Sequence, residues 1–289
     1  VKEKAEQGDA ESQNILGAMY LNGIGVSHNN SEAFKWLSKA AEQNVAEAQH
    51  NLALMYSKGI GETPKNNAEA VNWYRKAAEQ GLAESQRNLG VMYFIGKGVP
   101  QDYAQSIKWN LKAAMQGHAV AQASLAAMYL EGKGVPQNNS EAVKWLHKAA
   151  EQGLAEAQSL LSTMYLEGKG VPQDYAEAIK WYRKAALQGD VEAQFTLGFM
   201  YFDGKGVPQD NNEAFKWYRK AAVQGLAKAQ YKLGAMYGLG KGAPQDDTKA
   251  VKWLHKAAVQ GNVEAQSMLG IMNLHGKGIP QNYTEAFKW

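Results

Sequence analysis

The feature that most constrains this chain is the even spacing of its tryptophans. The eight tryptophans lie 36 residues apart, except for a first interval of 37. They are Trp36, Trp73, Trp109, Trp145, Trp181, Trp217, Trp253 and Trp289. A sequence that repeats with a period of about 20–50 residues folds as an array of stacked supersecondary units. We therefore expect a solenoid in which each unit packs on its neighbours.

Glycines that end a helix divide the sequence into units, with Asn44 in that place once. The units span residues 9–44, 45–81, 82–117, 118–153, 154–189, 190–225, 226–261 and, incomplete, 262–289. Residues 1–8 match the end of a preceding repeat helix. We expect one continuous solenoid that is a segment of a longer protein, because both ends fall inside repeats. The 37-residue unit carries its extra residue in residues 61–67, a loop, where an insertion is least disruptive.

The first half of each unit predicts a helix. Its apolar residues recur at offsets of 0, 4, 7 and 8, the spacing of one helical face, as in Ala193, Leu197, Met200 and Tyr201. A small residue such as Gly198 follows the recurring leucine. Because glycine weakens a helix by about 1 kcal/mol relative to alanine, its recurrence predicts a close helix crossing that admits no larger side chain.

The second half of each unit predicts another helix after a loop with two glycines and a proline. Asp174 with Glu177 three residues later is typical of its start and has the spacing of a capping box. One exception is Asp246, which Lys249 follows instead. An apolar stripe continues the helix, as in Ala178, Trp181, Tyr182 and Ala185.

Composition narrows the classes of partner. With 31 Lys+Arg against 28 Asp+Glu, the net charge of +3 gives no support for a nucleic-acid partner. No run approaches the roughly 18 apolar residues of a membrane span, so we expect no direct membrane insertion. The absence of cysteine excludes disulfides and thiolate chemistry. The compartment stays open between the cytoplasm, the bacterial periplasm and secretion.

Motifs of catalysis and metal binding are missing from the sequence. It has no Ser-x-x-Lys, Gly-x-Ser-x-Gly, His-Glu-x-x-His or P-loop pattern. The six histidines are scattered, and we expect solvated or cap-adjacent roles, with no metal and no cofactor. Six lysines share one loop position: Lys97, Lys133, Lys169, Lys205, Lys241 and Lys277. Acidic residues two positions before three of them favour a solvated edge over a phosphate or lipid site.

The unit at residues 155–186 carries a family resemblance. It reads Ala-Glu-Ala-Gln, then Gly-Lys-Gly-Val-Pro-Gln-Asp-Tyr, then Lys-Trp-Tyr-Arg-Lys-Ala-Ala. This pattern resembles the Sel-one-like repeat, a branch of the tetratricopeptide superfamily. The resemblance implies an all-α, right-handed α-α superhelix (solenoid) of about eight 36-residue helix-turn-helix repeats, whose first helices line the concave face. It also implies an adaptor or scaffold, in bacterial cell-envelope and host-interaction settings or in eukaryotic quality control.

Function is expected where the copies differ, because the shared residues hold the stack together. Four positions of each first helix lie off the packed stripe: the position two before the recurring leucine and the positions two, five and six after it. The resemblance places these positions in the concave groove. The candidate partner-binding residues there are His50, Leu54, Arg87, Val91, Phe94, Ala127, Leu130, Thr163, Leu166, Phe195, Phe199, Phe202 and Tyr231. The last four predict an aromatic interface patch. Alternatively, Phe195 and Tyr231 wedge between neighbouring helices as core.

These observations predict a non-enzymatic scaffold that binds another protein or a peptide segment in its groove. One alternative is an enzyme or a small-molecule binder, as in a cysteine-rich branch of the family linked to β-lactam binding. This chain lacks every cysteine of that branch. Another alternative is end-to-end self-association, in which the helix of Trp289 stacks on residues 1–8 of another copy.

Overall fold

The computed structural model describes residues 1–61 and 64–289, and over those residues the chain is helical with no strand. After a short α1 (Lys2–Glu6), first and second helices alternate. The first helices of the repeats are α2 (Ala10–Asn22), α4 (Ala46–Lys58), α6 (Ala83–Ile95), α8 (Ala119–Glu131), α10 (Ala155–Glu167), α12 (Val191–Asp203), α14 (Ala227–Leu239) and α16 (Val263–His275). The second helices are α3 (Asn30–Glu42), α5 (Asn67–Glu79), α7 (Tyr103–Met115), α9 (Asn139–Glu151), α11 (Tyr175–Leu187), α13 (Asn211–Val223), α15 (Asp247–Ala258) and α17 (Tyr283–Lys288). The all-α class is confirmed. Of the predicted insertion loop, Glu62 and Thr63 lie outside the described residues.

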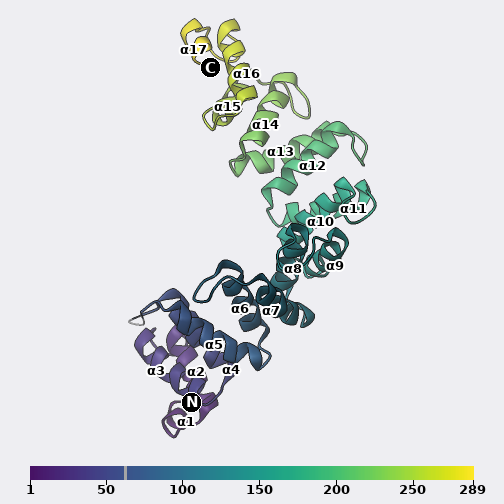
Figure 1. Cartoon of the computed structure of the whole chain (residues 1–289). Coiled ribbons are helices and arrows are strands. Elements are labelled where there is room, and N and C mark those ends of the chain that lie inside the picture. Colours follow the sequence, from purple (N-terminus) through teal and green to yellow (C-terminus); the bar gives the residue numbers. More distant parts are fainter. Residues whose placement is uncertain (62–63) are drawn as a thin grey trace. The chain divides into compact units, whose positions relative to one another are not determined.

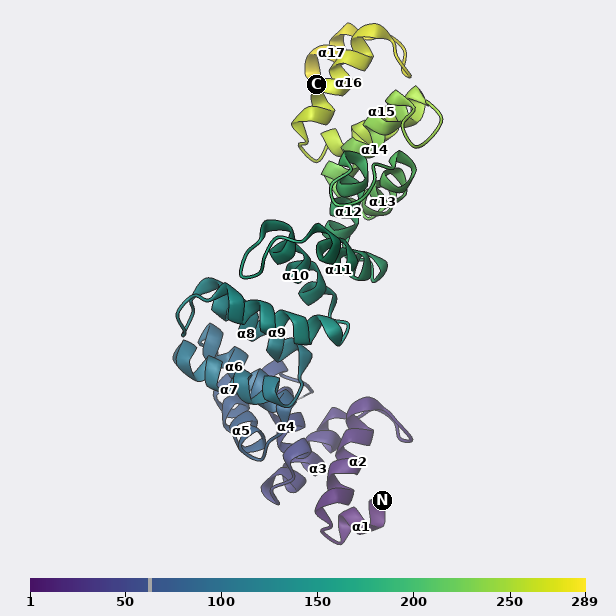
Figure 2. The same cartoon turned by 90° about the vertical axis from the view of Figure 1, so that its right-hand side faces the viewer.

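The chain divides into two compact units, 1–149 and 150–289, and each is described by itself. In the first unit α2 packs on α3, α4 on α5 and α6 on α7 (Figure 1). In the second unit the same pairing joins α10 to α11, α12 to α13 and α14 to α15 (Figure 2). Within each unit, second helices also contact the first helix of the next repeat, as α5 contacts α6 and α13 contacts α14. Repeats therefore stack through alternating helices within each unit.

The two predicted stripes form the core. Leu197 of α12 and Tyr218 of α13 are among the most completely buried side chains of the second unit. Their contact depends on the small residue that the sequence places after the leucine. A Cβ atom added at Gly198 would lie 2.6 Å from Cδ1 of Tyr218. The predicted close crossing is thus confirmed at this repeat.

Only one of the two hydrogen bonds of the predicted capping box forms at the start of α11. Asp174 accepts a hydrogen bond from the backbone N–H of Glu177 at 3.0 Å. The prediction of the second capping-box bond, from the backbone N–H of Asp174 to the side chain of Glu177, is wrong. The backbone N–H of Asp174 donates to the carbonyl of Tyr165 at 3.0 Å. The carboxylate of Glu177 pairs with Lys180 at 2.9 Å instead. Asp246, the exception in sequence, still caps α15 through a backbone N–H at 2.8 Å.

A glutamine on each first helix joins consecutive repeats, a role that the sequence analysis did not assign, and it is buried on every first helix except α16. The side-chain amide of Gln194 donates to the carbonyl of Ala186, in the preceding repeat, at 3.0 Å. Its oxygen accepts from the amide of Gln224 at 2.9 Å. The first unit has the same arrangement, in which Gln86 donates to Ala78 at 3.0 Å. These amides satisfy carbonyls that a helix C-terminus otherwise leaves without partners.

Candidate interaction surface of the first helices

All thirteen predicted partner-binding residues lie on first helices of the repeats. Twelve are half-buried, and Phe199 is exposed, with 39% of its surface accessible. No member of the set is fully buried, so each can be reached from solvent. We call this set the first-helix face. The positions on α4, α6 and α8 belong to the first unit, and those on α10, α12 and α14 belong to the second.

His50 on α4 and Arg87 on α6 are the polar members of the first-helix face in the first unit. The Nδ1 atom of His50 lies 2.8 Å from the hydroxyl oxygen of Ser85. Burial lowers the pKa of His50, against the opposing field of Glu84 and Glu47. The expectation that the histidines are solvated or cap-adjacent is therefore wrong for His50, whose ring packs edge-on against Tyr74 at 5.5 Å.

His118 meets the expectation for a cap-adjacent histidine. Its Nδ1 accepts a hydrogen bond from the backbone N–H of Ala121 at 3.2 Å, at the start of α8. Its Nε2 lies 2.7 Å from a carboxylate oxygen of Glu84 on α6. The imidazole thus joins two consecutive first helices of the first unit. Arg87, one turn along from Glu84, donates to Asn88 at 2.8 Å.

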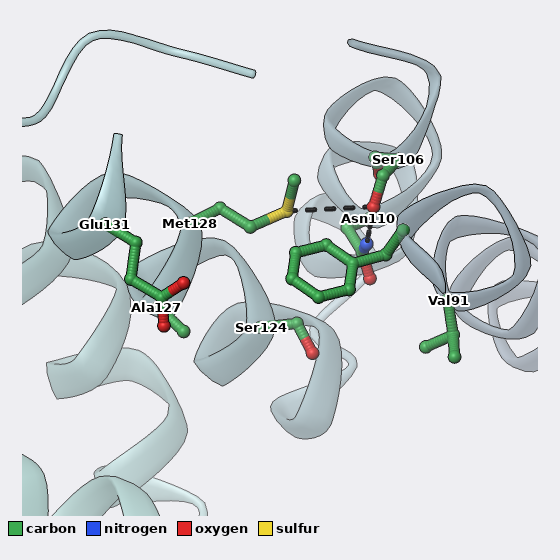
Figure 3. Close-up of a pocket in the computed structure, with 8 residues that line it drawn as sticks. Val91, Ser106, Asn110, Ser124, Ala127, Met128 and Glu131 are labelled. Atoms are coloured by element: carbon green, nitrogen blue, oxygen red, sulfur yellow. Dashed lines mark hydrogen bonds between the residues drawn. The ribbon is translucent and has the colours of Figure 1, made fainter. Parts of the chain in front are cut away.

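A pocket of about 190 Å³ opens among α6, α7 and α8 in the first unit (Figure 3). It brings together three predicted residues, Val91, Phe94 and Ala127. Leu130 lies on α8 but outside the lining of this pocket, and Leu54 lies on α4, which does not contribute to it. The remaining lining residues are Ser106, Asn110, Ser124, Met128 and Glu131. Sequence reasoning missed Asn110, although its column of the repeat otherwise holds only leucine or tyrosine.

In the second unit the predicted aromatic patch separates into supporting and exposed members. Phe195 packs on Tyr218 with ring centroids 5.5 Å apart, and Phe202 packs against the same core. Tyr231 packs against the core cluster of α15 and α16. Only Phe199 among these four predicted aromatics is exposed rather than half-buried.

Two further predicted residues lie on α10. The Thr163 hydroxyl donates to the carbonyl of Ser159 at 3.2 Å. Its oxygen lies 2.8 Å from the Tyr182 hydroxyl, so the tyrosine donates to the threonine. Leu166 packs against the core that contains Tyr182. Thr163 therefore links the first-helix face to the second helix beneath it.

A second apolar row, at the ends of second helices, was not predicted. Leu187, Val223 and Val259 occupy one repeat position in the second unit, and Val223 is 67% exposed. The signal was present in sequence, since the same position holds glutamate in Glu42, Glu79 and Glu151, although Met115 in the first unit is also apolar and exposed. This row competes with the first-helix face as an interaction surface.

The described residues were also compared with the requirements of a metal site, a Ser–His catalytic pair and a membrane span. Within residues 1–61 and 64–289, no group of three or more His, Asp or Glu side chains could hold a metal ion. The Ser85 hydroxyl beside His50 belongs to a residue with 0% exposure, so a substrate cannot reach it. Over the same residues no helix has the length and apolar character to cross a membrane.

Five of the six lysines of the repeated loop, all except Lys97, have a described contact with their own chain. Lys133 pairs with Glu131 at 2.6 Å, and Lys169 pairs with Glu167 at 2.7 Å. Lys205 lies over the ring of Tyr175, 5.2 Å from its centroid. The two carboxylate pairs reduce the positive field of their loops, as the acidic neighbours in the sequence predict.

Comparison with known proteins identifies the repeat. The Sel1 repeat family model matches residues 10–45, 46–82, 83–118, 119–154, 155–190, 191–226, 227–262 and 263–289. The structure of c5321, a protective antigen of uropathogenic Escherichia coli strains with an SLR fold, is 34% identical. That match covers 99% of this chain and 68% of c5321, with a TM-score of 0.81. A Sel1 repeat protein from Oxalobacter formigenes is 36% identical over 100% of this chain and 84% of its own, with a TM-score of 0.77.

A search of curated proteins gave no match. The family assignment depends on the repeats themselves, because eight consecutive matches run from residue 10 to residue 289. The chain belongs to the Sel1-repeat family, a branch of the tetratricopeptide-like superfamily of helical repeat solenoids.

Proposed function

We propose that this chain is a non-enzymatic scaffold that holds a segment of another protein along its first-helix face. Sel1-repeat proteins are generally protein-interaction scaffolds, and the fold is typically non-enzymatic. The observation that carries the proposal is the exposure of Phe199 on a helix whose other phenylalanines pack inward. Large aromatic side chains are common among the residues that contribute most of the binding energy at protein interfaces.

The neighbourhood of Phe199 also favours binding. Phe195 and Phe202 flank it on α12, and their burial against the core holds the helix surface in place. Lys228 lies over the ring of Phe195, 4.6 Å from its centroid, and Lys241 lies 5.4 Å from that of Phe202. An apolar centre with a charged rim is the usual anatomy of a protein interface.

Site-specific photo-crosslinking tests the proposal. A benzophenone amino acid replaces Phe199, and separate chains carry it at Val223 in the competing apolar row or at the exposed Asn212 as a polar control. We expect a discrete crosslinked protein from position 199 and none from position 212. Phe199→Ser should abolish crosslinking from a second face position, Leu166, while the far-ultraviolet circular dichroism stays unchanged. Crosslinks from position 223 alone would move the interaction to the ends of the second helices and refute the proposal.

A further inference from the structure

A stripe of basic residues that ends in an aliphatic residue runs along α11, α13 and α15 of the second unit. Its members lie at offsets of 0, 3, 4 and 7, which is one face of a helix. They are Lys180, Arg183, Lys184 and Leu187 on α11, Lys216, Arg219, Lys220 and Val223 on α13, and Lys252, His255, Lys256 and Val259 on α15. Every member is exposed. The apolar row of Leu187, Val223 and Val259 is therefore the end of a cationic surface.

The second helices of the first unit lack this combination. α5 has the same Arg-Lys pair as α13, but it carries Glu79 where α13 has Val223. α3 ends its stripe with Glu42. α7 ends its stripe with Met115 but has Leu111 in the arginine column. By sequence, only α11 and α13 combine arginine, lysine and an aliphatic end on one face.

A groove of about 750 Å³ lies between the stripes of these two helices. Leu187 of α11 and Val223 of α13 line it, and the cations Arg219 and Lys220 line it as well. The ring of Trp217 forms part of its wall, with the ammonium group of Lys220 lying 4.5 Å from the ring centroid. Ligand pockets usually have about 300–1,000 Å³. The groove therefore has the size of a binding site and offers apolar and cationic groups to one ligand.

Most of the positive charge in the groove is uncompensated. Among the lining residues that the structure describes, Glu213 is the acidic one, and it pairs with Lys216 at 2.7 Å. Arg219 and Lys220 have no ion pair with a described carboxylate. The arginine in the same column of α11 donates to a tyrosine hydroxyl of α12, whereas Arg219 makes no such bond to a described residue. Its planar guanidinium is thus available for a carboxylate, which it fits in a bidentate manner.

We propose that this groove binds an acidic segment of a partner protein, in which glutamate or aspartate side chains flank an apolar one. The carboxylates pair with Arg219 and Lys220, and the apolar side chain lies between Leu187 and Val223. Complementary charge guides such a segment to the groove and selects against basic segments. The groove belongs to the second helices and is separate from the first-helix face, so this inference goes beyond the proposed function.

The shape of the groove favours a peptide over a membrane or a nucleic acid. Proteins that lie on a membrane bury an apolar face in the lipid headgroup region, whereas Leu187 and Val223 line a hollow. Single-stranded nucleic acid stacks its bases on aromatic rings, and Trp217 in this groove is only 7% exposed. A segment that carries both carboxylates and an apolar side chain matches the groups that the groove presents.

Fluorescence anisotropy of the full chain with a short labelled peptide tests the groove. The probe is a synthetic peptide in which pairs of glutamates flank single leucines. We expect saturable binding. The same peptide with glutamine in place of glutamate should not bind, because it cannot pair with the cations. Serine in place of leucine should weaken binding about tenfold or more, because apolar burial is lost.

Two variants alter the groove on its exposed surface. Val223→Glu gives α13 the same end of its stripe as α5 and should abolish peptide binding. It should fold, because Val223 is 67% exposed. Arg219→Gln with Lys220→Gln should weaken binding about tenfold, since two exposed ion pairs are lost. The matched control is Arg75→Gln with Lys76→Gln on α5, which removes the same charge from a stripe that ends in glutamate and should leave binding unchanged.

Four results of the peptide titration would overturn the acidic-segment groove: no change in anisotropy, equal binding of the glutamine peptide, binding that survives in Val223→Glu, or equal weakening by the control on α5. Vesicles of phosphatidylserine and phosphatidylcholine supply a further test. If they bind the chain but not the Val223→Glu variant, the groove belongs to a membrane surface and the proposal is overturned. No variant here alters the first-helix face, so the crosslinking at Phe199 is decided separately.

Discussion

Replacing Tyr182 and Tyr218 by phenylalanine is expected to change the free energy of unfolding in opposite directions. The two residues occupy the same column of consecutive repeats, and their exposures are 4% and 0%. Tyr182 donates a hydrogen bond to Thr163 at 2.8 Å. The hydroxyl of Tyr218 has no partner among the residues that the structure describes. The position that would supply one holds Phe199, 36 residues after Thr163.

The magnitudes follow from these two environments. Both substitutions keep the buried ring and remove only the hydroxyl. A satisfied hydrogen bond contributes about 0.5–1.5 kcal/mol, so Tyr182→Phe should destabilise by about 1 kcal/mol. An unsatisfied buried hydroxyl costs about 1–3 kcal/mol, so Tyr218→Phe should stabilise by about 1 kcal/mol or more. The variants should therefore differ by about 2 kcal/mol.

Urea unfolding at pH 7, followed by circular dichroism at 222 nm, measures both changes. Because a repeat array can open locally, amide hydrogen exchange in α11 and α13 assigns each change to its repeat. A Tyr218→Phe variant that loses as much stability as Tyr182→Phe would refute the reasoning. A double-mutant cycle of Phe199→Thr with Tyr218→Phe adds a check, since the new hydroxyl at position 199 should couple to Tyr218 by about 1 kcal/mol.

Three other perturbations have defined outcomes. Gln194→Leu should lower the free energy of unfolding in urea by about 1–3 kcal/mol, because the carbonyl of Ala186 and the amide of Gln224 both lose a hydrogen-bond partner. Burial lowers the folded-state pKa of His50 below its usual 6.5, so stability is present above pH 6.5 and falls on acidification as the unfolded state takes up the proton. His50→Asn should flatten that pH dependence of the urea midpoint. Gly198→Ala should lower the urea midpoint, because the added Cβ atom would lie 2.6 Å from Tyr218. A higher urea midpoint would contradict this packing.

Repetition made the fold predictable from sequence. A single helical pattern can be ambiguous, but the same pattern occurring in eight repeats is not. The apolar stripes that contain Leu197 and Trp181, and the glycines of the turns, were therefore all predicted correctly. The return half of the capping box failed because it is not decided locally. The backbone N–H of Asp174 is taken by the carbonyl of Tyr165, on the other helix of the pair.

The candidate surface was less predictable, because exposure depends on neighbours in the next repeat. Phe195, Phe199 and Phe202 have the same residue type and lie on one helix, yet only Phe199 is exposed. The burial of Phe195 comes from Tyr218 of the second helix and Lys228 of the following repeat. Sequence spacing shows which residues share a helix, and it does not show which of them a neighbour covers.

Asn110 shows what a departure from the repeat costs in stability. The same column of the other repeats holds buried leucine or tyrosine, and Gly90 lies against Asn110 as Gly17 lies against Leu37. Deleting a buried leucine-sized side chain costs about 2–5 kcal/mol, so a repeat that holds Asn110 in place of leucine folds with less apolar burial than its neighbours. The Oδ1 atom of Asn110 also has no hydrogen-bond partner in the described part of the chain, which adds the cost of a buried, unsatisfied acceptor. Asn110→Leu should therefore raise the urea midpoint, and a lower midpoint would contradict this account of the third repeat.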